Sequence, residues 1–254
     1  MRQIAEDQYN SMSYFYDVLY SGIDLMDFEN TFINQYQDLL NTLPKNAKVL
    51  DSSCGNGVQA TALKRKGFNV VASDISEEMI RLTRGYADRN KLSFPTESLS
   101  WTELPSKYSD EFDAVFCIGN SISHSMGKDE MLSNLRALYK VTKNNGRLVI
   151  DTRNWDKLQN RYQRFQTSDV KSYNDKKYIF TYIWNAFEFN KSSYVEILFI
   201  EIINDKETKS NPIRLDFVPF SHEDFIDRLR SCGFRIQYDS FQPEIDYYHI
   251  VLEK

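Results

Sequence analysis

The chain has 254 residues, 41% of them apolar and 26% charged, which is enough to bury one substantial hydrophobic core. Its formal net charge is -5, and neither sign of charge forms a long run, so the composition argues against a nucleic-acid-binding protein. No stretch reaches the roughly 20 apolar residues of a membrane span, and the N-terminal segment shows no signal-peptide pattern.

The cysteines add a prediction about compartment. Cys54, Cys117 and Cys232 are scattered without the spacing of a disulfide framework or a zinc site. We therefore expect a single cytoplasmic domain over residues 1–254, with no metal and no membrane or nucleic-acid partner. Its state, monomer or homo-oligomer, is left open by the sequence.

The first part of the chain combines a helical region with a strand–turn–helix unit. Residues 9–43 carry apolar and aromatic side chains at spacings of three and four, which predicts two amphipathic helices in an N-terminal cap over residues 1–43. Pro44 ends this pattern, and a short apolar strand around Leu50 runs into the small-residue turn DSSCGNG. A helix over residues 58–65 follows.

The same alternation continues along the chain. A second buried strand covers residues 68–72, Ser76 caps a helix with an acidic first turn, and the strand ahead of Trp101 is weakly marked. A clear apolar strand at 114–119 and a helix over 128–141 then lead into the strand RLVIDTRN. This order predicts an α/β fold with a mainly parallel sheet, helices on both faces and a ligand crevice at the carboxyl ends of the strands.

From about residue 170 the pattern changes to aromatic and β-branched runs separated by polar turns, which predicts an antiparallel insertion over residues 170–218. Ser221 then opens a capping-box pattern, Gly233 ends the helix, and two short strands complete a C-terminal unit over residues 219–254. The core that precedes the insertion, residues 44–158, is expected to bind the cofactor.

The strongest local signal follows the first strand of this core. The glycines of Asp51-x-x-Cys54-Gly55-x-Gly57 let the backbone approach a ligand closely, and Asp74 ends the next strand, where a carboxylate can accept both hydroxyls of a ribose. A carboxylate just before the turn repels a pyrophosphate but tolerates an ammonium group. The pattern therefore favours S-adenosylmethionine (SAM), which has an amino-acid head and no phosphate, over a nicotinamide dinucleotide.

Four segments, VLDSSCGNG, VVASDIS, FDAVFCIGNSISH and LVIDTRNWD, carry a resemblance over about residues 9–158. In order and spacing they are similar to class I SAM-dependent methyltransferases, and within these to the glycine N-methyltransferase and glycine/sarcosine N-methyltransferase family. D-x-x-C-G-x-G occurs across the whole superfamily, whereas C-I-G-N-S-x-x-H followed by I-D-x-R-N-W-D is narrower. The resemblance implies a Rossmann-like, mainly parallel seven-stranded sheet, with the antiparallel insertion forming a substrate lid.

The resemblance also implies the residues that bind SAM. Asp74 would hold the ribose hydroxyls, Ile75 and Trp101 would enclose the adenine, and the backbone of Gly119 would line the cofactor channel. The full set implied for the cofactor is Tyr9, Asp51, Cys54, Gly55, Gly57, Asp74, Ile75, Met79, Ser100, Trp101, Ile118, Gly119 and His124.

Acceptor-binding and catalytic positions follow from the same motifs. Arg153, in I-D-x-R-N, would bind a carboxylate of the acceptor, because a guanidinium fork matches a carboxylate. Asn120 would contact the substrate and act in catalysis together with His124. Tyr16, and Tyr9 beside it, would close over the cofactor, with Tyr16 also in a catalytic role. S-adenosylhomocysteine would be the product.

The chain departs from the family in three places. The arginine that usually follows the N-terminal aromatic segment is missing from SGIDLMD at residues 21–27, Ser100 replaces an asparagine, and the insertion cannot be aligned. We expect methyl transfer from SAM to the amine of a small molecule such as glycine, sarcosine or a related amino acid. Methylation of an oxygen or nitrogen on a sugar or natural product, and SAM binding without catalysis, remain alternatives.

Overall fold

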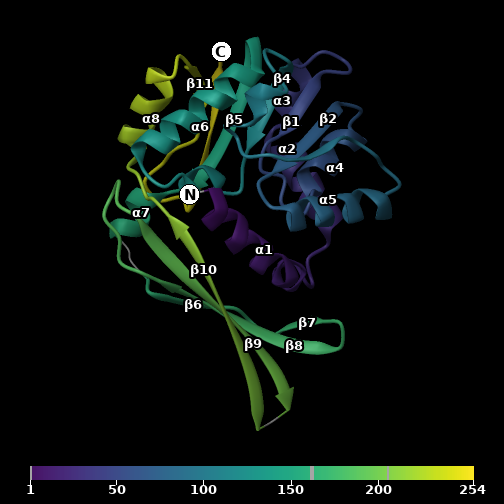
Figure 1. Cartoon of the computed structure of the whole chain (residues 1–254), viewed down its shortest axis with the longest axis vertical. Coiled ribbons are helices and arrows are strands. Elements are labelled where there is room, and N and C mark those ends of the chain that lie inside the picture. The colour runs from purple at the N-terminus through teal and green to yellow at the C-terminus, as the bar shows by residue number, and fades with distance from the viewer. Residues whose placement is uncertain (1, 161–162, 205) are drawn as a thin grey trace.

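The computed structural model describes residues 2–160, 163–204 and 206–254. Its main sheet has seven strands in the order β11-β12-β5-β4-β1-β2-β3 (Figure 1). Strand β12 runs antiparallel to both of its neighbours, and the pairings among β1 to β5 are parallel, so the predicted mainly parallel sheet is confirmed. The strands are β1 (Lys48–Asp51), β2 (Asn69–Asp74), β3 (Thr96–Ser98), β4 (Phe112–Cys117), β5 (Thr142–Arg153), β11 (Arg235–Asp239) and β12 (Tyr247–Glu253).

Helices cover both faces of this sheet because its strands are apolar on both sides. Val49 and Leu50 are adjacent on β1 and fully buried, yet they belong to different cores. Val49 packs in one with Phe32 and Leu63, and Leu50 in the other with Leu135. The first core is covered by α2 (Leu25–Gln35), α3 (Gln37–Thr42), α4 (Val58–Arg65) and α5 (Glu77–Arg89), and the second by α6 (Lys128–Val141) and α8 (His222–Ser231).

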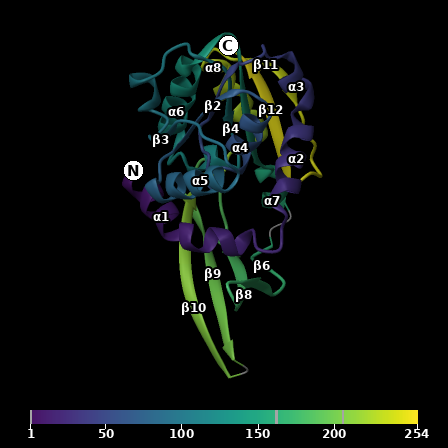
Figure 2. The same cartoon turned by 90° about the vertical axis from the view of Figure 1, so that its right-hand side faces the viewer.

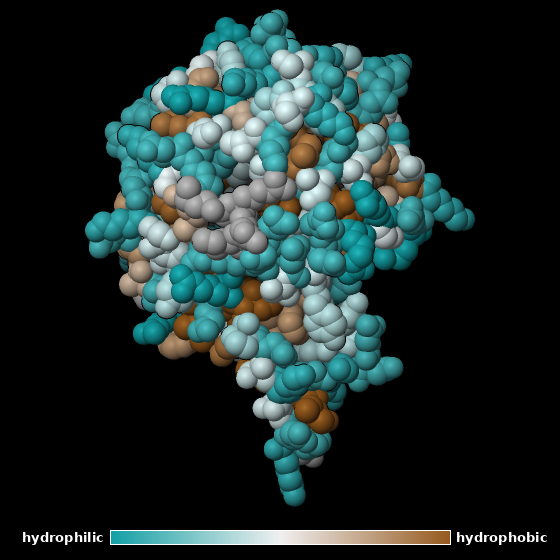
Figure 3. Space-filling model, viewed as in Figure 1, coloured by the Kyte–Doolittle hydropathy of each residue, from teal (hydrophilic) through white to brown (hydrophobic). Residues whose placement is uncertain are grey.

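The predicted antiparallel insertion is a separate second sheet, in the order β10-β9-β8-β6 with β7 paired to β8. Its first strand begins at residue 165 rather than at the predicted residue 170. In Figure 1 its long strands extend away from the main sheet, and Figure 3 shows hydrophobic surface where this extension leaves the body. The strands are β6 (Phe165–Thr167), β7 (Lys171–Tyr173), β8 (Lys176–Trp184), β9 (Ser193–Asn204) and β10 (Glu207–Phe217), and α7 (Trp155–Asn160) precedes them.

The N-terminal helix α1 (Arg2–Leu19) lies between the two sheets (Figure 2). On one side it contacts α5, and on the other it contacts β7 and β10. The rings of Phe15 and Phe199 stack at 4.4 Å between centroids, and Tyr173 donates a hydrogen bond to Asp17 at 3.0 Å. The region predicted as two helices therefore contains three, and the first of them links the second sheet to the core.

None of the helices in the described ranges is long and apolar enough to cross a bilayer.

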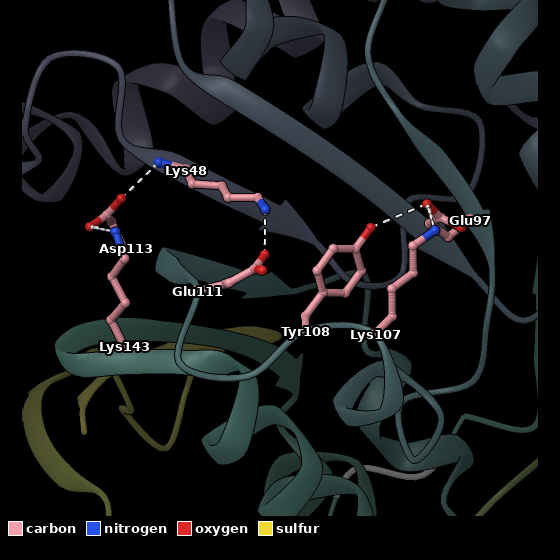
Figure 4. A network of polar contacts seen from close by, with 7 residues as sticks. All are labelled: Lys48, Glu97, Lys107, Tyr108, Glu111, Asp113 and Lys143. Carbon is pink, nitrogen blue, oxygen red and sulfur yellow. Dashed lines mark hydrogen bonds and ion pairs between the residues drawn. The ribbon is translucent and has the colours of Figure 1, made fainter.

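Charged side chains link the parallel strands to one another near their amino ends (Figure 4). The amide of Lys48 donates to Asp113 at 2.7 Å, the same carboxylate pairs with Lys143 at 2.8 Å, and the ammonium of Lys48 pairs with Glu111. Charges at this edge are thus satisfied by one another, and the opposite, carboxyl edge is the one at which ligands bind in such sheets.

The turn between β1 and α4 depends on Gly57. Its φ is +83°, and a Cβ at this position would lie 2.8 Å from the Cα of Thr83 on α5. Gly57 therefore permits both a left-handed backbone and the close approach of α5 to the start of α4.

We predict that Gly57→Ala lowers the free energy of unfolding by about 2 kcal/mol or more, because backbone strain and a clash with the backbone of α5 act together. Gly67→Ala is the matched control, since Gly67 also has a positive φ but a Cβ placed there would have no neighbour within 4 Å; it should cost only about 1 kcal/mol. Urea denaturation measures both. Equal losses would show that the contact with Thr83 contributes nothing.

Candidate functional site

A cavity of about 470 Å³ opens at the carboxyl edge of the main sheet. This is within the size range of small-molecule and cofactor pockets. Its floor is the turn after β1 together with the ends of β2 and β4, and α1 forms the opposite wall. Of the residues predicted from the sequence, those that line the cavity are Tyr9, Tyr16, Cys54, Gly55, Asp74, Ile75, Ser100, Trp101, Ile118, Gly119 and His124.

Asp74 is held at the end of β2 by backbone amides. Its Oδ2 accepts from the amide of Gly55 and its Oδ1 from the amide of Ser76, each at 3.0 Å. Burial raises the pKa of this carboxyl, and the backbone hydrogen bonds oppose that shift. Each carboxylate oxygen still has a free lone pair, so the group can accept two further hydrogen bonds from vicinal hydroxyls.

Gly55 lies beneath a tyrosine from α1. Its φ is +52°, and a Cβ there would be 3.3 Å from the hydroxyl oxygen of Tyr16. Across the cavity, Trp101 donates its indole N–H to the carbonyl of Ser52 at 2.7 Å, which fixes the plane of the ring. Ile75 and Trp101 both line the cavity, as a flat apolar slot for a purine requires.

His124 is the last residue of the short 3₁₀ helix after β4, and both of its ring nitrogens form hydrogen bonds. Its Nδ1 lies 2.6 Å from the carbonyl of Asp216, and its Nε2 lies 2.9 Å from the hydroxyl of Tyr9. A carbonyl can only accept, so Nδ1 carries the proton and Nε2 accepts from Tyr9. Burial lowers the pKa of His124, which favours this neutral form. In this arrangement His124 positions Tyr9, and its predicted catalytic role stays a prediction.

The cavity is electrostatically one-sided. Asp74, Glu103, Glu130 and Asp151 line it, whereas no lysine or arginine of the described chain does. Oε2 of Glu130 is buried and has no hydrogen-bond partner within the described ranges. These groups favour a ligand that carries positive charge and hydrogen-bond donors.

Two carboxyl groups are perturbed by burial. Asp51 lies beneath the cavity and is buried, and neither of its carboxylate oxygens has a hydrogen-bond partner among the described residues. Burial is the larger cause and the charge of Asp74 the smaller one; together they raise the pKa of Asp51 to about 7, although the amides of Ser53 and Ala60 favour a lower value. Burial likewise raises the pKa of Asp151 to about 6, although the amide of Asn120 donates to it at 2.9 Å. A nearby ammonium group would favour the ionised form of both.

Some predicted residues lie outside the cavity lining. Gly57 contacts α5, as described above, and Met79 is fully buried within α5. Asn120 joins the loop after β4 to the end of β5, because its Oδ1 accepts from the hydroxyl of Thr152 and the amide of Arg153, each at 3.0 Å. These contacts support a bracing role for Asn120; its predicted contact with the substrate stays a prediction.

Arg153 also lies outside the cavity lining, at the end of β5. Its guanidinium is 4.9 Å from the ring centroid of Trp184 and 4.8 Å from that of Tyr247. The predicted lid contributes no lining residue to the cavity, because α1 stands between them. Its role in covering the substrate is therefore still a prediction.

Other lining residues were not predicted. They include Tyr20 just after α1, Phe28 on α2, Glu130 and Asn134 on α6, and Asp151. Asp151 carried a usable signal, since it stands at a strand end in the I-D-x-R-N motif. Glu130 carried none, because a glutamate in the first turn of a helix is common at any helix start.

Comparison with known proteins fits this geometry. Residues 49–146 match a family model described as a methyltransferase domain. A glycine/sarcosine N-methyltransferase of Parasynechococcus marenigrum (strain WH8102) is 38% identical over 111 residues, which cover 43% of this chain and 39% of that protein. The chain thus matches only about two fifths of the length of this curated relative.

Solved structures match over nearly the whole chain. A SAM-dependent methyltransferase from Clostridium acetobutylicum gives a TM-score of 0.75 at 18% identity, covering 96% of this chain and 98% of that one. A SAM-bound amino pentose methyltransferase from Micromonospora echinaspora gives 0.71 at 13% identity, covering 91% and 92%. The fold, second sheet included, is thus one that methyltransferases use, and the resemblance to class I SAM-dependent methyltransferases is confirmed.

Proposed function

We propose that the protein transfers the methyl group of SAM to the amine of a small molecule. The observation that carries this proposal is a cavity lined by carboxylates and aromatic rings, and by no lysine or arginine of the described chain, at the carboxyl edge of a parallel sheet. SAM is a net cation, with a sulfonium and an ammonium against a single carboxylate, and it has a purine to stack. A dinucleotide would bring a pyrophosphate towards these acidic groups.

The residues present fit the ribose, the adenine and the ammonium group of SAM. Asp74 would accept the ribose hydroxyls, Trp101 and Ile75 would enclose the adenine, and the turn at Gly55 would take the methionine portion, with Asp51 beneath it favouring the ammonium. SAM supplies a methyl group on an already reactive sulfonium, so the protein mainly has to position the acceptor and exclude water.

For the acceptor we propose glycine, sarcosine or a related amino acid. The curated relative named above supports this choice through the core segment that it shares. Arg153 would bind the acceptor's carboxylate. Asp151, at the edge of the cavity two residues earlier on the same strand, would lie on the side of the amine. A neutral amine is the nucleophile, and desolvation beside the sulfonium would help it to lose its proton.

An amino sugar is a second candidate, favoured by a specific observation. The match to the amino pentose methyltransferase extends over the second sheet, whereas the glycine/sarcosine relative matches less than half of this chain. The rings of Tyr182, Trp184 and Tyr247 around Arg153 also offer more surface than glycine needs.

Asp74→Ala tests the SAM site. The variant loses the hydrogen bonds to both ribose hydroxyls, and we expect the Kd of S-adenosylhomocysteine to rise about 10- to 100-fold by calorimetry. Asp88→Ala, at an exposed position on α5, is the control and should bind normally. Unchanged affinity in a folded Asp74→Ala protein would refute the assignment.

Binding of SAM should release protons near pH 6.5. Asp51 and Asp151 are partly protonated there because burial raises their pKa values to about 7 and about 6, and a cationic ligand lowers both values. Calorimetry in buffers of different ionisation enthalpy should detect the proton release, which should fall towards zero by pH 8 and be smaller in Asp151→Asn.

Without ligand, the raised pKa values of Asp51 and Asp151 mean that the free energy of unfolding falls as the pH rises from 4 to 7. Proton uptake on binding at pH 6.5 would contradict this account.

Turnover tests the acceptor. With SAM, glycine and sarcosine should yield S-adenosylhomocysteine, and Arg153→Ala should raise the acceptor's KM about 10-fold or more while the KM of SAM changes little. Arg164→Ala, an exposed arginine over Phe165, is the control. Turnover on amino sugars alone would replace the acceptor and keep the reaction. Binding of SAM without turnover on either class would favour a non-catalytic SAM-binding protein.

A further inference from the structure

Arg153 is enclosed by rings from two distant parts of the chain. Trp184 comes from β8 in the second sheet and Tyr247 from β12 in the main sheet, and each ring centroid lies within 5 Å of the guanidinium carbon. Trp184 is buried, whereas Tyr247 is about half exposed. A guanidinium beside two rings in this way offers its N–H edge, rather than its faces, to a ligand.

That edge is not used by the protein. Within the described ranges, no carboxylate forms an ion pair with Arg153, and its side chain donates no hydrogen bond to a described residue. The nearby acids are otherwise engaged, since Asp151 accepts the amide of Asn120 and Asp246 pairs with Lys157. A half-buried arginine with free donors can bind an anion.

The enclosure adjoins the SAM cavity. Tyr247 and Tyr182 both interact electrostatically with Arg153 and with Tyr20, which lines the cavity. Burial raises the pKa of each of these two tyrosines, and the positive charge of Arg153 opposes that shift. Tyr247 also interacts with Asp151 at the cavity edge.

We propose that Trp184 and Tyr247 are positioning residues that hold Arg153 so that its N–H edge faces the carboxylate of the methyl acceptor. The inference rests on the proposed function and deepens it, because it makes the second sheet part of the acceptor site although that sheet lines none of the SAM cavity. The physical gain is pre-organisation: the rings restrict a flexible side chain before the acceptor binds, and they exclude water that would weaken the ion pair.

Four variants test this arrangement of Trp184 and Tyr247 around Arg153, called the clamp below, by enzyme kinetics. Trp184→Leu and Tyr247→Leu remove a ring face, and each should raise the KM of sarcosine about 10-fold with the KM of SAM within about twofold. Trp184→Phe and Tyr247→Phe keep a ring and should restore most of the loss. In an Arg153→Ala background, the leucine substitutions should have no further effect on the acceptor. The proposal would be overturned if the KM of sarcosine and the KM of SAM rose equally, or if a leucine substitution raised the KM of sarcosine further in the Arg153→Ala background.

A second readout does not need turnover. In the full-length protein, the Nε–Hε signal of Arg153, assigned with Arg153→Lys, should be shifted upfield by the two rings in a ¹⁵N spectrum. It should move downfield in Tyr247→Leu, which folds even if the buried Trp184 does not tolerate replacement, and it should respond to added acetate. If no glycine-like amine is methylated but this signal behaves as described, the acceptor assignment fails and the clamp stands. A signal at the position of a solvent-exposed arginine would overturn the clamp.

Discussion

The hydrogen bonds of His124 join the main sheet, α1 and the second sheet. Its Nδ1 donates to the carbonyl of Asp216 on β10, its Nε2 accepts from Tyr9 on α1, and its own turn follows β4 of the main sheet. Gln8 reinforces this junction, because its side chain bonds both the amide and the carboxylate of Asp216. This junction holds α1 where its Tyr9 and Tyr16 line the cavity.

Helix α1 stands between the second sheet and the cavity, which that sheet does not line. The sheet supports the outer side of α1 through Phe15 and Phe199, and it reaches Arg153 at the end of β5 through Trp184. The cavity is thus shaped by the main sheet and α1, whereas the surroundings of Arg153 are shaped where the two sheets meet.

The sequence predicted the core well because parallel strands buried on both faces are continuously apolar, and the polar residues at their carboxyl ends mark the site. Asp74 and Gly55 were found this way. The location of the second sheet could not be predicted, because alternation along a strand shows which side is buried but not what covers it. For the same reason the contacts of Asn120 with Thr152 and Arg153, and the close approach of Gly57 to Thr83, could not be predicted. The predicted ligand contacts of Asn120 and Gly57 stay predictions.

The carboxylates and aromatic rings of the cavity favour a cationic nucleoside without phosphates. Equilibrium binding of SAM to the purified protein, in competition with NAD⁺, tests it most directly. We expect that SAM saturates one site per chain and that an excess of NAD⁺ does not displace it. Binding of NAD⁺ that excludes SAM, or no binding of SAM at all, would contradict the claim.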